Sequence, residues 1–252
     1  MPITETFDNT TEEILKPSHV IKKIEGFPET VIVTFDGQML DTFLKNNKSE
    51  KIGSVHASID IPIYKTVYKG KEIAFYLTWL GGPATVGILD EIIVMGAKKI
   101  LLFGSCGSLD NSITEGHIIV PTHAYRDEGT SYHYISTESG DFIEVKTASR
   151  LKKIFDELDI PAIEGRTWTT DAIFRETRHN MELRKKTGCI TVEMECASVM
   201  AMAQFRNVEA WQFLYTADNL DSKEWESRIL VDMPNNLYER YTRIAMEAAV
   251  RI

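Results

Sequence analysis

Short apolar runs alternate with longer amphipathic segments along most of the 252-residue chain. The apolar runs have the length and β-branched content of buried strands, and the amphipathic segments carry apolar residues at helical spacing. The strand candidates are residues 31–35, 64–68, 73–79, 99–103, 117–121, 162–170, 188–192 and 211–215, and the helix candidates are residues 40–44, 84–95, 151–158, 197–205 and 237–248. Strands that alternate with helices are typical of the α/β class. We therefore predict one α/β domain over residues 1–252, with a central mixed β-sheet flanked by helices and residues 1–30 as an N-terminal extension.

Two carboxylates, Glu193 and Glu195, stand where the predicted strand at 188–192 gives way to a helix. A third, Asp218, follows the next apolar run. Open α/β sheets bind ligands at the carboxyl ends of their strands, so we predict that two adjacent strands deliver these carboxylates to one edge of the sheet. Carboxylates in that place suit a ligand with hydroxyl groups to hold and a leaving group to protonate.

Two glycine-rich segments are candidates for binding an anion. Gly81-Gly82-Pro83 precedes a helix whose first N–H groups can bind an anion, although an ordinary strand–helix turn explains the same residues equally well. Gly104-Ser105-Cys106-Gly107 is predicted to be a loop after a buried strand, with Ser105 offering a hydroxyl group to an anion or a sugar. This second segment lacks the spacing of a dinucleotide-binding fingerprint and the lysine of a P-loop.

Composition narrows the classes of function. The formal charge of −9 argues against a nucleic-acid partner, because neutralising phosphates needs a basic face. No apolar run approaches the ~20 residues of a membrane helix, and the first residues lack the basic and apolar regions of a signal peptide. Cys106, Cys189 and Cys196 form no Cys-x-x-Cys pair, so we expect reduced, buried thiols in a cytoplasmic protein. The histidines fit no zinc-binding spacing, and we expect no metal site.

In order and spacing, four markers resemble the nucleoside phosphorylase superfamily, which includes purine and uridine phosphorylases and their nucleosidase relatives: Gly81-Gly82-Pro83, Gly104-Ser105-Cys106-Gly107, Val192-Glu193-Met194-Glu195 and Asp218. The resemblance runs from about Val31 to the C-terminus. It implies that Glu195 holds the ribose 2′- and 3′-hydroxyls and that Met194 packs against the sugar, with Glu193 as a further residue of the ribose site. It also implies that Asp218 protonates or hydrogen-bonds N7 of a departing purine. Trp168 or Phe174 is a candidate for stacking on the base, although an aromatic residue at a strand end is more often part of the core.

The chain departs from the family where the phosphorylases hold phosphate with arginines. The three corresponding places, in the segment from Phe35 to Met39, near Ile59 and at Leu102, have no arginine. Phosphate binding without a guanidinium loses its strongest bidentate donors. Two explanations stay open. Either other arginines complete an anion site, or water replaces phosphate as the nucleophile; the candidates for the anion site are Gly81, Gly82, Ser105, Arg126, Arg175 and Arg178.

We therefore predict an enzyme that cleaves the N-glycosidic bond of a nucleoside and transfers the ribosyl group to phosphate or to water. A purine is favoured, because the glutamine and arginine with which pyrimidine phosphorylases read uracil are missing near Thr177 and His179. The alternative is a non-catalytic nucleoside or nucleotide sensor that retains the ribose pocket. No cofactor is expected, and phosphate is the candidate co-substrate.

Family members build active sites across a dimer interface, so the resemblance also implies a homodimer or a hexamer made as a trimer of dimers. The segment from Arg126 to Tyr134 is predicted to be an exposed loop. Its tyrosines and its arginine are the composition of an interface core. We expect this segment to lie near both the site and a neighbouring subunit.

Overall fold

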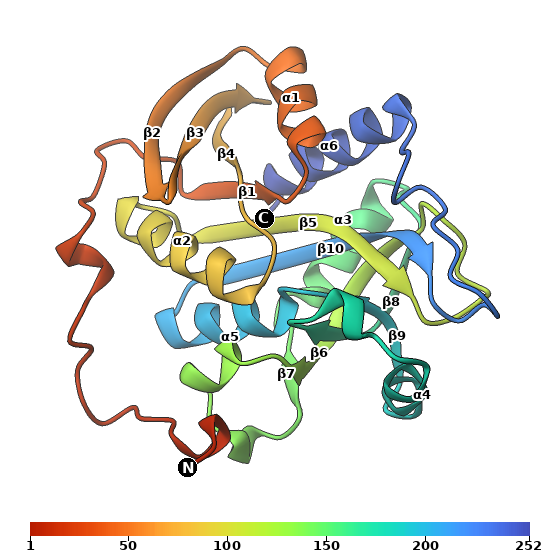
Figure 1. Ribbon diagram of the computed structural model, residues 1–252. Coiled ribbons are helices and arrows are strands. Elements are labelled where there is room, and N and C mark those ends of the chain that lie inside the picture. The colour runs from red at the N-terminus through yellow and green to blue at the C-terminus, as the bar shows by residue number, and fades with distance from the viewer.

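A computed structural model describes all residues, 1–252, and contains one mixed sheet of ten strands covered by helices (Figure 1). The strands are β1 (Thr30–Thr34), β2 (Ser49–Ala57), β3 (Ile59–Tyr68), β4 (Lys71–Leu77), β5 (Lys99–Ser108), β6 (Ile118–Asp127), β7 (Phe142–Glu144), β8 (Ala162–Thr170), β9 (Cys189–Glu193) and β10 (Glu209–Asn219). The α-helices are α1 (Gly37–Asn46), α2 (Gly82–Met95), α3 (Ala148–Glu157), α4 (Arg178–Lys186), α5 (Cys196–Arg206) and α6 (Asn235–Ala249). The predicted class, a mixed α/β sheet flanked by helices, is confirmed.

The strand order is β10-β6-β8-β9-β5-β1-β4-β3-β2, and β10 also pairs with β5. This extra pairing closes β10, β6, β8, β9 and β5 into a ring. A small apolar cluster, formed by Cys106, Ile113, Ile119 and Leu214 with Ile163 and Ile190 packed against it, draws on all five strands. The ring brings the ends of β5, β9 and β10 together, which an open sheet in sequence order would not do.

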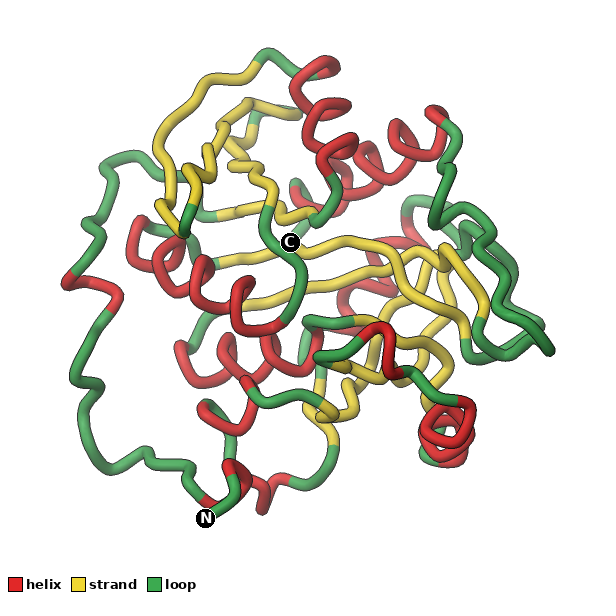
Figure 2. Tube along the Cα trace, viewed as in Figure 1, coloured by secondary structure: helices red, strands yellow, loops and turns green.

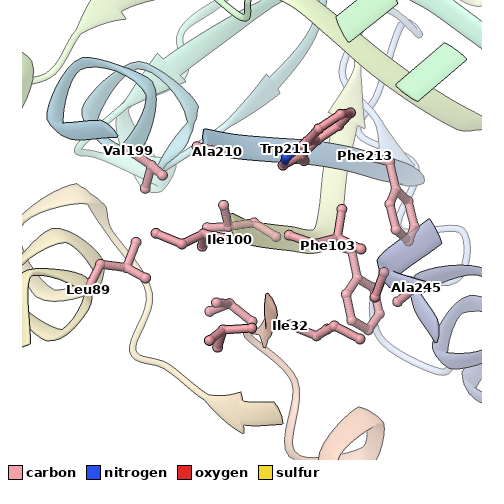
Figure 3. Close-up of a cluster of buried hydrophobic side chains, with 14 of the residues drawn as sticks. Ile32, Leu89, Ile100, Phe103, Val199, Ala210, Trp211, Phe213 and Ala245 are labelled. Carbon is pink, nitrogen blue, oxygen red and sulfur yellow. The ribbon is translucent and has the colours of Figure 1, made fainter. Parts of the chain in front are cut away.

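Helices cover both faces of the long strands (Figure 2). In the core, Leu89 of α2 and Val199 of α5 lie to one side of the strand residues, while Ala245 of α6 lies beside Phe213 (Figure 3). The rings of Phe103 and Phe213 stack with their centroids 5.3 Å apart. Strands buried on both faces read as continuous apolar runs, which is why the sequence pattern identified them.

Most predicted elements are confirmed, including strands β3, β4 and β8 and helix α2. The prediction of a loop at Gly104–Gly107 was wrong, because β5 continues to Ser108. Gly107 and Ser108 pair with Val192 and Thr191 of β9, and the same stretch pairs with β10. Strands β2 and β7 were not predicted from the sequence.

The N-terminal extension contains only two short 3₁₀ turns and runs along the outside of the molecule (Figure 1). Glu13 in this extension forms an ion pair of 2.7 Å with Arg206 of α5. The three cysteines are buried and form no disulfide, as predicted. No helix has the length and apolar character needed to cross a membrane.

Candidate active site

Glu193 ends β9 and is held by the protein itself. Its Oε2 accepts hydrogen bonds from the backbone N–H groups of Glu195 (2.8 Å) and Cys196 (2.7 Å), the first residues of the turn into α5. The hydroxyl of Thr169, in register on β8, donates to Oε1 at 2.6 Å. A carboxylate in this place satisfies N–H groups that a helix leaves without partners. Both oxygens of Glu193 are therefore occupied before any ligand arrives.

Glu195 is buried, with 5% of its surface exposed, and its Oε1 accepts the backbone N–H of Gly81 at 2.6 Å. Gly81 has a φ of +93°, which favours glycine, and it immediately precedes helix α2. The N–H at this helix start therefore binds a side chain of the protein. Gly82 serves packing, because a Cβ there would lie 2.2 Å from the Ser198 hydroxyl. The predicted anion loop at Gly81 and Gly82 is in this structure a support for Glu195.

Both glutamates lack a lysine or arginine partner. Burial raises the pKa of each above the ordinary value of 4.5, and the charge of Glu193 adds to the rise at Glu195. Met194 between them is half-buried. The weakly ionised Glu195 carboxyl lies next to the half-buried side chain of Met194. Because it has no ion pair to break, it can form hydrogen bonds with adjacent hydroxyl groups of a ligand.

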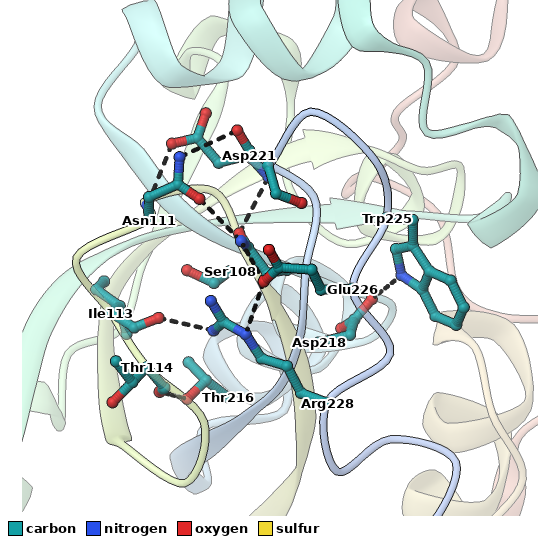
Figure 4. A network of polar contacts seen from close by, with 12 residues as sticks. Ser108, Asn111, Ile113, Thr114, Thr216, Asp218, Asp221, Trp225, Glu226 and Arg228 are labelled. Atoms are coloured by element: carbon teal, nitrogen blue, oxygen red, sulfur yellow. Dashed lines mark hydrogen bonds and ion pairs between the residues drawn. The ribbon is translucent and has the colours of Figure 1, made fainter.

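Asp218 lies near the end of β10, and its Oδ2 accepts the Trp225 indole N–H at 2.7 Å (Figure 4). Burial raises the pKa of Asp218, against the opposing effects of that hydrogen bond and of the Arg228 charge. The Arg228 guanidinium donates to the carbonyl of Ile113 at 2.9 Å and pairs with Glu226 at 3.3 Å. Sequence reasoning missed Trp225 and Arg228, since they stand in an irregular segment with no periodic pattern.

The prediction that β9 and β10 are adjacent was wrong. Each of these two strands pairs with β5 instead. Gly107 of β5 is in register with Val192 on one side and with Asp218 on the other. A Cβ at Gly107 would lie 3.1 Å from Asp218 Oδ1, so the glycine allows close approach. The two strands thus bring Asp218 and the Glu193–Glu195 turn to opposite sides of one glycine.

A cavity of about 490 Å³ opens beside Asp218. Six apolar residues form most of its wall: Ile173, Phe174, Met181, Leu220, Trp225 and Leu230. Three charged residues, Glu176, Arg178 and Asp218, complete the lining. Phe174 lines this cavity and is 96% exposed, and its role in base binding stays a prediction. Trp168 does not line the cavity. It is 1% exposed, and its indole N–H donates to Asp127 at 2.9 Å, so the prediction that it stacks on a base is withdrawn.

The arginines predicted as candidates for an anion site either bind other groups of the protein or are exposed to solvent. Arg126 is 3% exposed and donates to the Ser131 hydroxyl and to backbone carbonyls including that of Ser136 at 3.0 Å. Arg178 donates to the carbonyls of Ser222 and Lys223 at 2.9 and 3.3 Å. Arg175 is exposed. The prediction that Arg126 binds an anion was therefore wrong, because its guanidinium N–H groups already donate to oxygens inside the protein.

The places at which the resemblance had suggested missing arginines are apolar in space as well. Met39 and Leu102 are fully buried, and Ile59 is half-exposed at the start of β3. The ring of Phe35 packs against β5, with its Cδ2 2.9 Å from where a Cβ on Gly104 would stand. Ser105 is exposed at this edge. No cluster of three or more histidine, cysteine, aspartate or glutamate side chains is arranged to hold a metal ion.

Comparison with known proteins gives a consistent result. The family model described as the phosphorylase superfamily matches residues 29–249. A DeoD-type purine nucleoside phosphorylase of Caldanaerobacter subterraneus subsp. tengcongensis is 28% identical over 191 residues, which are 72% of this chain and 78% of that protein. A guanosine phosphorylase of Halorubrum lacusprofundi is 26% identical over 160 residues, 62% of this chain and 66% of that protein. The crystal structure of a Toxoplasma gondii purine nucleoside phosphorylase with immucillin-H superposes with a TM-score of 0.77 at 18% identity, covering 96% of this chain and 98% of that one.

Proposed function

Because this chain belongs to the phosphorylase superfamily, we propose that it cleaves the N-glycosidic bond of a purine nucleoside at the site described above. The observation that carries the proposal is the placement of Asp218 and of the Glu193–Glu195 turn on opposite sides of Gly107. Purine specificity is supported by the relatives, several of which are named purine nucleoside phosphorylases.

Glu195 and Met194 hold the ribose in this proposal. Cleavage of the glycosidic bond builds positive charge on the sugar ring and negative charge on the leaving base. The Glu195 carboxyl accepts hydrogen bonds from the ribose hydroxyls, and its ionised form stabilises the positive charge where it develops. Glu193 positions the turn through Thr169 and the start of α5, and it does not need to touch the substrate.

Asp218 delivers a proton to the base. Burial raises the pKa of Asp218 above its ordinary value, which shifts the carboxyl toward its acid form, and the Trp225 indole fixes the orientation of the carboxyl. Protonation at N7 makes the purine a neutral leaving group, which lowers the barrier to C–N cleavage. The cavity next to Asp218 has the apolar walls that a planar base requires.

For the acceptor of the ribosyl group we propose water. Neither glutamate of the turn has an arginine or lysine partner, and Phe35 packs against the β5 backbone at Gly104. Arg126 and Arg178 direct their donors at the protein's own oxygens. Within one chain, Arg126 and Arg178 therefore offer no free bidentate guanidinium to a dianionic phosphate beside the ribose carboxyls.

The test is a panel of purine and pyrimidine nucleosides, incubated with and without phosphate, with free base and sugar products quantified. Release of base and free ribose at a rate that phosphate does not change would support both parts of the proposal. Formation of ribose 1-phosphate would refute water as the acceptor while keeping the cleavage. Tight nucleoside binding without release would favour the sensor.

We further propose a homodimer or a trimer of dimers. Large apolar side chains are exposed around the cavity and on the segment before α2: Trp79, Leu80, Phe174, Trp225 and Val231. The expectation that Tyr132 and Tyr134 are exposed was wrong. Tyr132 packs on the Arg126 guanidinium at 4.0 Å, and the Tyr134 hydroxyl donates to Asp90 at 3.1 Å.

A further inference from the structure

Glu176 is a carboxyl in the cavity that the proposed mechanism does not use. It stands between the 3₁₀ turn Ile173–Arg175 and helix α4, and it lines the cavity together with Asp218. Its two following residues are held in place. The Thr177 hydroxyl accepts the Asn180 N–H and caps α4, and the Arg178 guanidinium donates to carbonyls of the 220–223 loop. The Glu176 side chain itself makes no hydrogen bond or ion pair within the protein.

The electrostatic surroundings of Glu176 leave it in need of a partner. Burial raises its pKa to about 8, and the nearby Asp218 charge contributes to the rise. A polar group in an apolar cavity costs free energy unless it is hydrogen-bonded. The Arg178 guanidinium donates its hydrogen bonds to loop carbonyls, and the Trp225 indole donates to Asp218. The cavity therefore contains two carboxyls and few free hydrogen-bond donors.

We infer that Glu176 determines base specificity by accepting hydrogen bonds from the N1–H and 2-amino groups of a guanine base. This inference rests on the proposed function. A purine that offers N7 to Asp218 carries its Watson–Crick edge on the opposite side of the rings, so a second group is needed to read it. Guanine presents two adjacent donors there, which match the two oxygens of a carboxylate. Adenine presents an acceptor at N1 and would leave one carboxylate oxygen facing a lone pair.

The first test measures kcat/KM for guanosine, inosine and adenosine with the wild-type protein and with Glu176→Gln. The amide keeps the shape of the side chain but loses one acceptor, so we expect the guanosine-to-adenosine ratio to fall about 100-fold. Glu182→Gln, an exposed glutamate of α4, is the matched control and should leave the ratio unchanged. An unchanged ratio in a folded Glu176→Gln protein would overturn the inference and leave the proposed cleavage intact.

The second test does not depend on turnover. Calorimetric titration with 9-methylguanine at pH 7, in buffers of different ionisation enthalpy, counts the protons released on binding. Because the pKa of Glu176 is raised to about 8, the wild type should release most of one proton more than Glu176→Gln does. Titration with 9-methyladenine should show no such difference. Equal proton release from both proteins, or binding of the adenine compound alone, would overturn the inference even if no nucleoside were cleaved.

Discussion

Glu193 and Glu195 are two positions apart and belong to the same motif, yet their surroundings give them different tasks. Glu193 receives three hydrogen bonds from Thr169 and from the start of α5, so both of its oxygens already have partners within the protein. Glu195 is held through the Gly81 N–H. At the scale of single residues, Glu195 is therefore the carboxyl that can exchange partners with a substrate.

Replacing Glu195 with glutamine should separate substrate binding from folding. The amide oxygen can still accept the Gly81 N–H, and the substitution removes a buried acid next to Glu193. We expect kcat/KM to fall about 100- to 1,000-fold with no loss of thermal stability. Glu164→Gln, on the exposed side of β8, is the control. Near-wild-type kinetics would remove Glu195 from the ribose site, and a large drop in melting temperature would assign it a structural role.

Replacing Asp218 with asparagine should depend on the leaving group. Asparagine can keep the Trp225 hydrogen bond through its carbonyl oxygen but cannot donate an acidic proton. Purine nucleosides should lose about 100- to 10,000-fold in kcat, whereas a nitrophenyl riboside, whose leaving group needs no proton, should be largely spared. Equal losses on both substrates would mean that Asp218 orders the cavity and does not act as the acid.

The same carboxyls make stability depend on pH. A carboxyl whose pKa is higher in the folded chain binds more protons when folded. Its contribution is complete below the ordinary value of 4.5 and is lost as the pH rises through the raised pKa values of Glu193 and Glu195. The melting temperature should therefore be lower at pH 9 than at pH 6, and Glu195→Gln should reduce that difference by about 3 °C. An identical pH profile in the variant would contradict the assignment.

At the scale of elements, strand β5 organises the site because its last residues pair on both sides. Gly107 meets β9 and β10 at the same level of the sheet, and the absent side chain leaves room for Asp218 and Val192. The glycine-rich segment that resembled a ligand-binding loop is thus a strand on which other elements place the carboxyls.

Adding one methyl group at Gly107 should damage activity more than folding. A Cβ there would lie 2.5 Å from a Leu220 methyl carbon and 3.1 Å from Asp218 Oδ1, so the Leu220 side chain must move and the Asp218 carboxyl is crowded. We expect Gly107→Ala to cost about 1–3 kcal/mol of stability and to lower kcat at least 10-fold. Gly37→Ala, in the first turn of α1 with open space around its Cα, should do neither. Full activity in Gly107→Ala would show that Asp218 tolerates displacement.

Local patterns predicted most strands and helices, because buried strands and amphipathic helices have distinct periodicities. The same patterns could not show that β5 separates β9 from β10, since pairing between distant segments leaves no local signal. Trp168 was misassigned for a related reason. An aromatic side chain at a strand end has the same appearance in sequence whether it faces a ligand or, as here, donates to Asp127 inside the core. Glu176 and Trp225 stand in segments without periodicity, and only the fold brings them to Asp218.

At the scale of the whole molecule, exposed apolar side chains near the cavity favour assembly. Phe174 and Trp225, which line the cavity, are 96% and 57% exposed, which is unusual for side chains of this size at the mouth of a site. Light scattering at working concentration should give a mass of at least twice the 28.6 kDa of one chain. A fully active monomer would refute both the assembly and any sharing of the site between subunits.

The ring of five strands has a consequence for biosynthesis. Strand β10, residues 209–219, is the last strand along the chain, and its pairing with both β5 and β6 completes the ring. A nascent chain that has emerged only as far as α5 carries the Glu193–Glu195 turn but has no Asp218. Its strand β5 can pair with β9 but still lacks β10. Asp218, the proposed acid, lies in the strand that closes the ring, so this carboxyl reaches the site in the step that completes the sheet. We therefore expect a chain that ends before Glu209 to have neither a closed ring of strands nor the carboxyl that we propose as the acid.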